Sequence, residues 1–187
     1  MLKTGEDREV GIKGELFVYE YILEQVMSGR PGNVSWTSEL RHLAKPELGK
    51  WSPPDKTTFF ADITIDDKDG HFRKWLEIQG YVDGNQLPGM SLKFHIEVKS
   101  SKGGNDDAFH LSDWQLEAAR DMAEFPEDGL DDGRVVANVF LIWRVTSALG
   151  KTPGWSIIDD FWKKWLEGNI IVRAPQGLLV WETRELK

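Results

Sequence analysis

The chain has 187 residues, of which 40% are hydrophobic and 29% charged, proportions typical of a globular domain. It contains no cysteine, which excludes disulfides and thiolate metal sites and leaves carboxylates as the ligands for any hard cation. No apolar run is long enough to span a membrane, and the charged first residues do not resemble a secretion signal. We therefore expect an intracellular protein, nuclear or cytoplasmic, with no membrane partner. The formal net charge of −8 argues against affinity for nucleic acid based on overall charge.

The first part of the chain predicts one helix followed by two strands. Apolar residues with helical spacing run through residues 10–27, and the turn GRPGN ends that helix. Residues 34–40 are typical of a strand, and residues 45–58, with several Pro and Lys, of a loop. In residues 59–66 apolar and polar side chains alternate, so Asp62 lies on the polar face of a second strand.

The middle of the chain predicts a third strand and a second helix. Residues 71–79 fit either a strand or a short helix, and the sequence leaves both open. Residues 92–100 are typical of a strand. A helix is expected over residues 113–125, with Ser112 as its N-cap. The acidic residues 126–133 are typical of a solvated turn.

The last part of the chain predicts a long apolar strand over residues 134–145, a short amphipathic helix over 159–167 and a final strand over 177–183. The order of these elements predicts an α/β protein whose mixed central sheet is flanked by helices. We expect one domain over the whole chain, with a core at about 10–145 and a C-terminal helix–strand extension at about 146–187.

The third predicted strand carries two opposite charges on one face. In the run KFHIEVKSS, Glu97 and Lys99 are two positions apart and share a face, whereas Ile96 and Val98 face the opposite layer. With Asp62 of the neighbouring strand they form a unit of two carboxylates and a lysine. Such a unit can hold a divalent cation, and the lysine can orient or help to deprotonate an attacking water. For Glu97 and Lys99 alone, the alternative is a surface ion pair worth about 0–1 kcal/mol.

Five segments within residues 10–145 carry a resemblance when they are taken together. They are GIKGELFVYEYI (11–22), WTSELR (36–41), FADITIDD (60–67), FHIEVKSS (94–101) and FHLSDWQLEAA (109–119). The chain resembles the PD-(D/E)xK nuclease superfamily and, more narrowly, the C-terminal domain family of the protein NO VEIN. The resemblance implies a restriction-endonuclease-like αβββαβ core. It also implies metal-dependent hydrolysis of phosphodiester bonds, with nucleic acid, and DNA in particular, as the expected substrate.

The same resemblance implies a role for each residue of the charged unit. Asp62 and Glu97 would ligate Mg²⁺ or Mn²⁺, with the Val98 carbonyl as a third ligand. Lys99 would act on the water, and Glu15 of the first helix would complete the metal site. Glu15 also fits a carboxylate in the first helical turn, where the helix dipole favours it.

Residues beside this centre each have two interpretations. Gln115 would contact the active centre, but with Ser112 it also forms an S-D-W-Q capping box. Ser100, Ser101 and Lys102 precede two glycines, so the loop's backbone amides and the lysine would be able to approach a phosphate of the nucleic acid. A plain turn is the alternative for that loop.

Two functions stay open at this point. The first is the metal-dependent nuclease. The second is a nuclease-like fold, weak or inactive in catalysis, that acts as a protein-interaction module within a larger protein. The acidic net charge favours the second, whereas a basic stripe formed by Lys93, Lys99, Lys102, Arg73 and Lys74 would favour the first. Other domains of a longer chain and a second copy of the same chain stay open as further partners.

Overall fold

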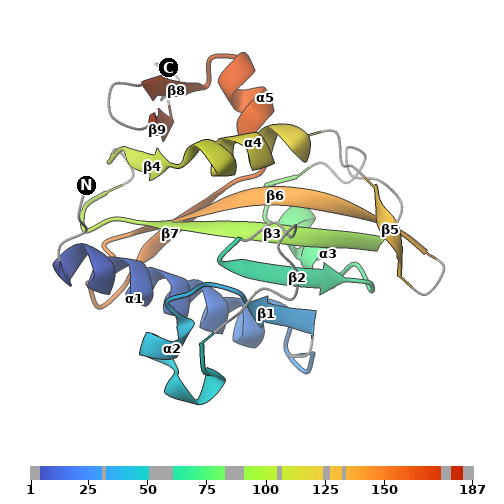
Figure 1. Cartoon of the computed structure of the whole chain (residues 1–187), viewed down its shortest axis with the longest axis horizontal. Coiled ribbons are helices and arrows are strands. Elements are labelled where there is room, and N and C mark those ends of the chain that lie inside the picture. Colours follow the sequence, from blue (N-terminus) through green and yellow to red (C-terminus); the bar gives the residue numbers. More distant parts are fainter. Residues whose placement is uncertain are drawn as a thin grey trace.

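A mixed β-sheet with helices on both faces forms the centre of the molecule (Figure 1). The computed structural model describes residues 5–30, 33–50, 61–82, 91–104, 107–123, 127–131, 134–173 and 178–182. Within these residues the main sheet has six strands in the order β1-β2-β3-β6-β5, and β7 also pairs with β6. These strands are β1 (Val34–Trp36), β2 (Ile63–Asp67), β3 (Ser91–Ser100), β5 (Glu127–Asp131), β6 (Arg134–Thr146) and β7 (Gly154–Ile158).

Strand β3 lies in the interior of this sheet. It pairs antiparallel with β2 from Leu92 to Ile96 on one side, and parallel with β6 over its whole length from Ser91 to Ser100 on the other. The other edge of β6 is shared between β5 and β7, which both run antiparallel to it. Residues Leu92 to Ile96 therefore lie between strands on both sides, whereas Glu97 and Lys99 have β6 on one side and lie just beyond the last pair with β2 on the other.

The two faces of the sheet are covered by different helices. Helix α1 (Gly5–Tyr21), which continues as the π-helix η1 (Ile22–Val26), packs with α3 (His71–Ile78) on one face. Helices α4 (Asp113–Asp121) and α5 (Phe161–Leu166) cover the other. Because successive strand residues alternate between faces, Phe94, Ile96 and Val98 point towards α1, and Glu97 and Lys99 towards α4.

A second, smaller sheet joins the C-terminal part of the chain to the middle. Its strands lie in the order β4 (Phe109–Leu111), β9 (Leu178–Glu182) and β8 (Ile170–Arg173). Since β7 belongs to the main sheet and β9 pairs with β4, the segment expected as an extension is joined to the core by strand pairing.

The undecided segment at residues 71–79 is a helix, α3. Asp67 explains why. Its carboxylate accepts hydrogen bonds from the backbone N–H groups of Phe72 at 3.0 Å and Arg73 at 2.8 Å, which are unpaired donors of the first helical turn. Gly70 precedes the helix with a positive φ of 69°, a conformation that glycine adopts without strain.

Several predicted boundaries differ from the structure. The first helix begins earlier, at Gly5, and the first strand ends at Trp36, after which the chain turns into α2 (Arg41–Ala44) and η3 (Pro46–Leu48). The acidic segment expected as a turn contains β5, so that prediction was wrong: backbone pairing with the edge of β6 forms this strand without an apolar pattern.

The second predicted strand begins later in the structure, at Ile63, so Asp62 precedes it, and strands β4, β7 and β8 were not predicted. The second helix and its Ser112 cap are confirmed, and the long apolar strand is β6, next to β3. The predicted residues 51–60, 124–126, 132–133, 177 and 183 lie outside the described ranges. Among the helices that the structure describes, none has the length and apolar character needed to cross a membrane.

Candidate functional site

Asp62 immediately precedes β2, and Glu97 of β3 lies just beyond the last residue that pairs with β2. The two strands pair in antiparallel register through Ile63 and Ile96, so the next positions along each strand are neighbours. Asp62 Oδ2 accepts a hydrogen bond from the Val98 N–H at 2.8 Å. The chain between the two strands includes α3, which packs on the α1 face and leaves the α4 face to the charged side chains.

Glu97, Lys99 and Gln115 form a closed network on the α4 face. Lys99 Nζ lies 3.0 Å from Glu97 Oε1 and donates a hydrogen bond to Gln115 Oε1 at 3.0 Å. The Gln115 amide donates in turn to Glu97 Oε1. The side chains of Lys99 and Glu97 are only 15% and 7% exposed. This pair is therefore not a surface ion pair on an edge strand.

Gln115 also completes the cap of α4. Its Oε1 accepts a hydrogen bond from the Ser112 N–H at 2.9 Å, and its own N–H donates to Ser112 Oγ at 3.4 Å. Gln115 therefore contacts the charged centre and forms the capping box at the same time, as both interpretations of the sequence predicted. The capping box fixes the side chain at the N-terminus of α4, where it reaches Glu97 and Lys99.

Glu15 approaches the same region from α1. It is buried, and its Oε2 accepts a hydrogen bond from the Trp36 indole at 3.0 Å. Because α1 begins at Gly5, Glu15 lies well inside the helix, and a first-turn dipole effect does not explain it. The neighbouring Gly14 packs directly on Ser100: a Cβ at position 14 would lie 1.7 Å from Ser100 Oγ. Glycine at this position thus allows α1 to reach the end of β3.

We refer to Glu15, Asp62 and Glu97 together with Lys99 as the acidic cluster. Burial raises the pKa of Asp62 well above its ordinary value, and the negative charges of Glu97 and Glu15 raise it further. The Val98 N–H and the Lys99 ammonium act in the opposite direction. Asp62 is therefore within electrostatic range of both other carboxylates and of Lys99.

The donors at the acidic cluster suit a hard cation. Asp62 and Glu97 provide carboxylate oxygens, and the Val98 N–H holds the Asp62 carboxylate beside β3. In the ranges that the structure describes, no three acidic or imidazole side chains are gathered tightly enough to hold a metal by themselves. Mg²⁺ is commonly held by one or two carboxylates together with water and substrate phosphate, so these residues fit Mg²⁺ or Mn²⁺ in that mode.

The loop after β3 is organised by its own contacts. Ser101 donates a hydrogen bond from Oγ to the Gly103 carbonyl at 3.2 Å, and its N–H pairs with the Val145 carbonyl at 2.9 Å. Lys102 Nζ lies 2.8 Å from a carboxylate oxygen of Glu6. Ser100 Oγ is buried beneath Gly14 rather than directed outwards. A role of this loop in binding nucleic acid stays a prediction.

The basic stripe that would favour a nuclease is not assembled. Arg73 and Lys74 lie on α3, which packs on the face opposite to Lys93 and Lys99. Arg73 pairs with Glu77, and Lys99 and Lys102 also have acidic partners. Three of the five residues thus have acidic partners, which compensate part of their positive charge.

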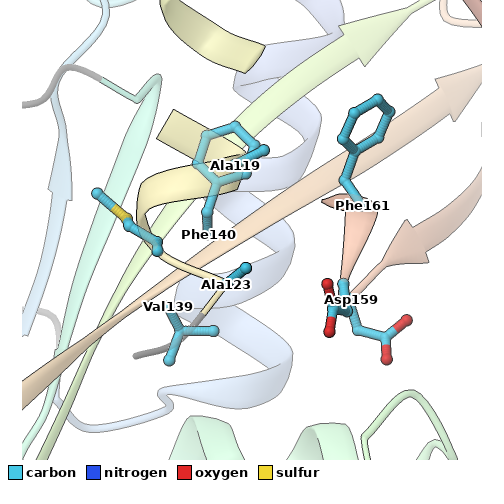
Figure 2. A pocket seen from close by; sticks show the side chains of 8 residues that line it. Ala119, Ala123, Val139, Phe140, Asp159 and Phe161 are labelled. Carbon is cyan, nitrogen blue, oxygen red and sulfur yellow. The ribbon is translucent and has the colours of Figure 1, made fainter. Parts of the chain in front are cut away.

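A small pocket is lined by residues of α4, β6 and α5 and of the segments next to the two helices (Figure 2). Ala119 and Ala123 of α4 and the region after it, Phe140 of β6 and Phe161 of α5 give it an apolar lining. Its acidic groups already have partners, because Asp159 pairs with Lys164 and Asp160 caps α5 through the Lys163 N–H. The carboxylates beside this pocket are therefore engaged in contacts within and next to α5.

Sequence reasoning missed the residues that hold the acidic cluster in place. Trp36 binds Glu15, and the backbone N–H groups of Thr37 and Ser38 donate to the Asp62 carbonyl. The segments WTSELR and GIKGELFVYEYI contain these residues and Gly14, but nothing in their composition shows that an indole meets a carboxylate.

Comparison with known proteins adds no family assignment. The chain has no match among protein-family models, curated proteins or solved structures. The acidic cluster is therefore the feature on which a function has to be based.

Proposed function

We propose that this protein is a metal-dependent nuclease with a PD-(D/E)xK-like core. The observation that carries the proposal is the meeting of Asp62, which immediately precedes β2, with Glu97 and Lys99 of the adjacent strand β3, the last two nearly enclosed. Gathering several carboxylates at a buried position destabilises a fold unless a ligand compensates their charge. A divalent cation is such a ligand.

The arrangement of the elements supports the same proposal. Helix α1 is followed by β1, β2 and β3, then by α4 and β6, an order that fits an αβββαβ core when α2, α3, β4 and β5 are treated as additions. The parallel pairing of β3 with β6 and the antiparallel pairing of β2 with β3 give a mixed sheet with the charged residues near its centre.

Each residue of the site has a task in hydrolysis. Asp62 and Glu97, with the Val98 carbonyl, would hold Mg²⁺ or Mn²⁺, and Glu15 would add negative charge from α1. The bound cation would supply Lewis acidity that stabilises negative charge on the phosphate. Lys99 would orient the attacking water and favour its deprotonation, since its ammonium lies within 3.0 Å of Glu97 Oε1. Gln115 would keep Lys99 and Glu97 together.

The charge distribution favours a second candidate, a nuclease-like interaction module. The formal net charge is −8, and the cations proposed as a basic stripe are separated by the sheet or paired with acids. A duplex held mainly by phosphate contacts needs several such cations. In the interaction module the acidic cluster would persist without catalysis.

Cleavage of nucleic acid distinguishes the two candidates. Single- and double-stranded DNA and RNA are incubated with the protein in Mn²⁺ or Mg²⁺, beside Lys99→Met and the control Lys93→Met on the same strand face. We expect at least one substrate to be cut, with a loss of about 100-fold or more in Lys99→Met and little change in the control. Absence of cleavage of every substrate, or cleavage that Lys99→Met leaves intact, would contradict the nuclease.

A further inference from the structure

The indole of Trp36 is directed at a carboxylate of the acidic cluster. Its N–H donates to Glu15 Oε2 at 3.0 Å, across 21 positions of sequence, and both side chains are buried, at 2% and 6% exposed. An indole nitrogen can only donate and an ionised carboxylate can only accept, so this bond has one possible direction. A bond to a buried charged acceptor is also stronger than one between neutral groups.

The same short segment holds a second member of the acidic cluster. The Asp62 carbonyl accepts hydrogen bonds from the N–H groups of Thr37 at 2.8 Å and Ser38 at 3.1 Å. Thr37 Oγ1 adds a bond to the Ala61 carbonyl at 2.6 Å. The segment from Trp36 to Ser38 thus fixes the Asp62 backbone and the Glu15 side chain relative to each other.

Trp36 itself is held on two sides. The ring of Tyr19 packs on it with centroids 5.1 Å apart, and Arg41 Nη1 donates to the Trp36 carbonyl at 2.8 Å. Arg41 also binds the carbonyls of Leu48 and Gly49, which anchors it in turn. The indole can therefore impose an orientation on Glu15 rather than follow it.

Burial of a tryptophan in this core does not by itself require a partner for the indole. Trp143 lies in the same hydrophobic cluster, fully enclosed and stacked on Trp75, and its N–H has no hydrogen-bond partner within the described ranges. The Trp36 N–H differs from it in one respect, its bond to Glu15. Trp143 therefore provides a matched control for the substitution of an indole by a benzyl ring.

We propose that Trp36 is a positioning residue, whose indole N–H holds the Glu15 carboxylate in the acidic cluster and thereby sets the affinity of the site for a divalent cation. This inference rests on the proposed function, because it assumes a cation at the acidic cluster. It extends the site to a residue that touches neither metal nor substrate. Removing the indole N–H would take away the donor that orients Glu15 Oε2.

The test is a calorimetric titration of Mn²⁺ into the metal-free full chain, with wild type, Trp36→Phe and Trp143→Phe compared below their unfolding temperatures. Loss of a residue that orients a metal ligand typically weakens affinity about 10- to 100-fold. We expect Trp36→Phe to weaken the affinity for Mn²⁺ in that range. Trp143→Phe should change this affinity by less than about twofold, as expected for a substitution at a site that does not interact with the metal site. A general packing effect would weaken both variants alike and would overturn the inference.

A double-mutant cycle with Glu15→Gln separates orientation from other effects. Trp36→Phe should add no further loss of Mn²⁺ affinity once the charge of Glu15 is gone. If Trp36→Phe does not fold, Glu15→Gln alone still decides, since unchanged Mn²⁺ affinity in that variant overturns the inference. Absence of Mn²⁺ binding in the wild type would overturn the proposed function. Binding in the wild type that Trp36→Phe leaves unchanged would overturn only the role of Trp36.

Discussion

The Asp62 carboxylate accepts a hydrogen bond from the Val98 N–H at 2.8 Å, across 36 positions of the chain. The first residue pair between β2 and β3 is Asp67 with Leu92, and the last is Ile63 with Ile96. Beyond that last pair, the Asp62 side chain replaces the backbone as the contact with β3. The Asp62 carbonyl turns instead to Thr37 and Ser38. Strand β2 therefore begins to leave β3 beside Glu97, where the acidic cluster lies.

The first prediction concerns the pH dependence of stability without metal. The pKa of Asp62 is raised in the folded protein, so between its ordinary value of 3.8 and the folded value the folded state binds more protons than the unfolded state. The free energy of unfolding should then fall as pH rises above about 4, until Asp62 is ionised in the folded state as well. Urea titrations from pH 4 to 8 measure this slope.

Asp62→Asn is the variant that assigns the slope. In this variant the free energy of unfolding should fall less steeply as pH rises. At neutral pH the variant should be more stable than wild type, because a neutral amide replaces a repelled charge. Asp67, whose pKa burial also raises, keeps its own contribution in the same direction. Equal slopes in wild type and Asp62→Asn would show that the repulsion within the acidic cluster is compensated in another way.

The second prediction concerns the packing of α1 on β3. A Cβ at position 14 would lie 1.7 Å from Ser100 Oγ and 2.7 Å from Ser100 Cβ, so Gly14→Ala should destabilise the protein by about 1–3 kcal/mol. At Gly11 of the same helix the nearest atom, of Leu40, is 3.8 Å away. Gly11→Ala should stabilise by about 0.5–1 kcal/mol. Thermal unfolding of both variants checks the pair, and similar effects would contradict the close approach at Gly14.

The third prediction separates the two tasks of Gln115. Ser112→Ala removes the capping hydroxyl and should cost about 1 kcal/mol of stability while leaving cleavage unchanged at a permissive temperature. Gln115→Ala should cost a similar amount and also lower cleavage by about tenfold, because Lys99 and Glu97 lose their bridge. Unfolding and cleavage are measured on the same preparations. A loss of cleavage in Ser112→Ala equal to that in Gln115→Ala would assign the effect to α4 rather than to the amide.

The fourth prediction concerns Asp67. Replacement by alanine leaves the N–H groups of Phe72 and Arg73 without their acceptor, so Asp67→Ala should destabilise by about 1–2 kcal/mol. The adjacent Asp66 side chain is 42% exposed and pairs with Lys68, so Asp66→Ala should change stability by less than about 0.5 kcal/mol. Urea unfolding of the two variants compares neighbouring carboxylates with and without a capping role.

The sequence predicted the charged centre better than its surroundings. Alternation within β2 and β3 placed Asp62 on the polar face of β2 and Glu97 and Lys99 on one face of β3, because side-chain direction in a strand depends only on position. The S-D-W-Q pattern predicted the cap of α4, because that signal is local. Both features need little knowledge of the tertiary structure.

Features that depend on distant partners were missed. Strand β5 contains acidic residues and a glycine, and the edge of β6 determines its conformation rather than its own pattern. The role of Asp67 depends on a helix that begins after the turn, and the contact of Trp36 with Glu15 joins two elements 21 positions apart. Such pairings follow from packing, which composition and periodicity do not encode.

The most direct test of the acidic cluster as a metal site is a calorimetric titration of Mn²⁺ into the metal-free wild type beside Asp62→Ala. We expect binding in the micromolar to low-millimolar range, about 4–8 kcal/mol, which disappears in the variant. Absence of binding in the wild type, or equal affinity in Asp62→Ala, would contradict a metal site at the acidic cluster.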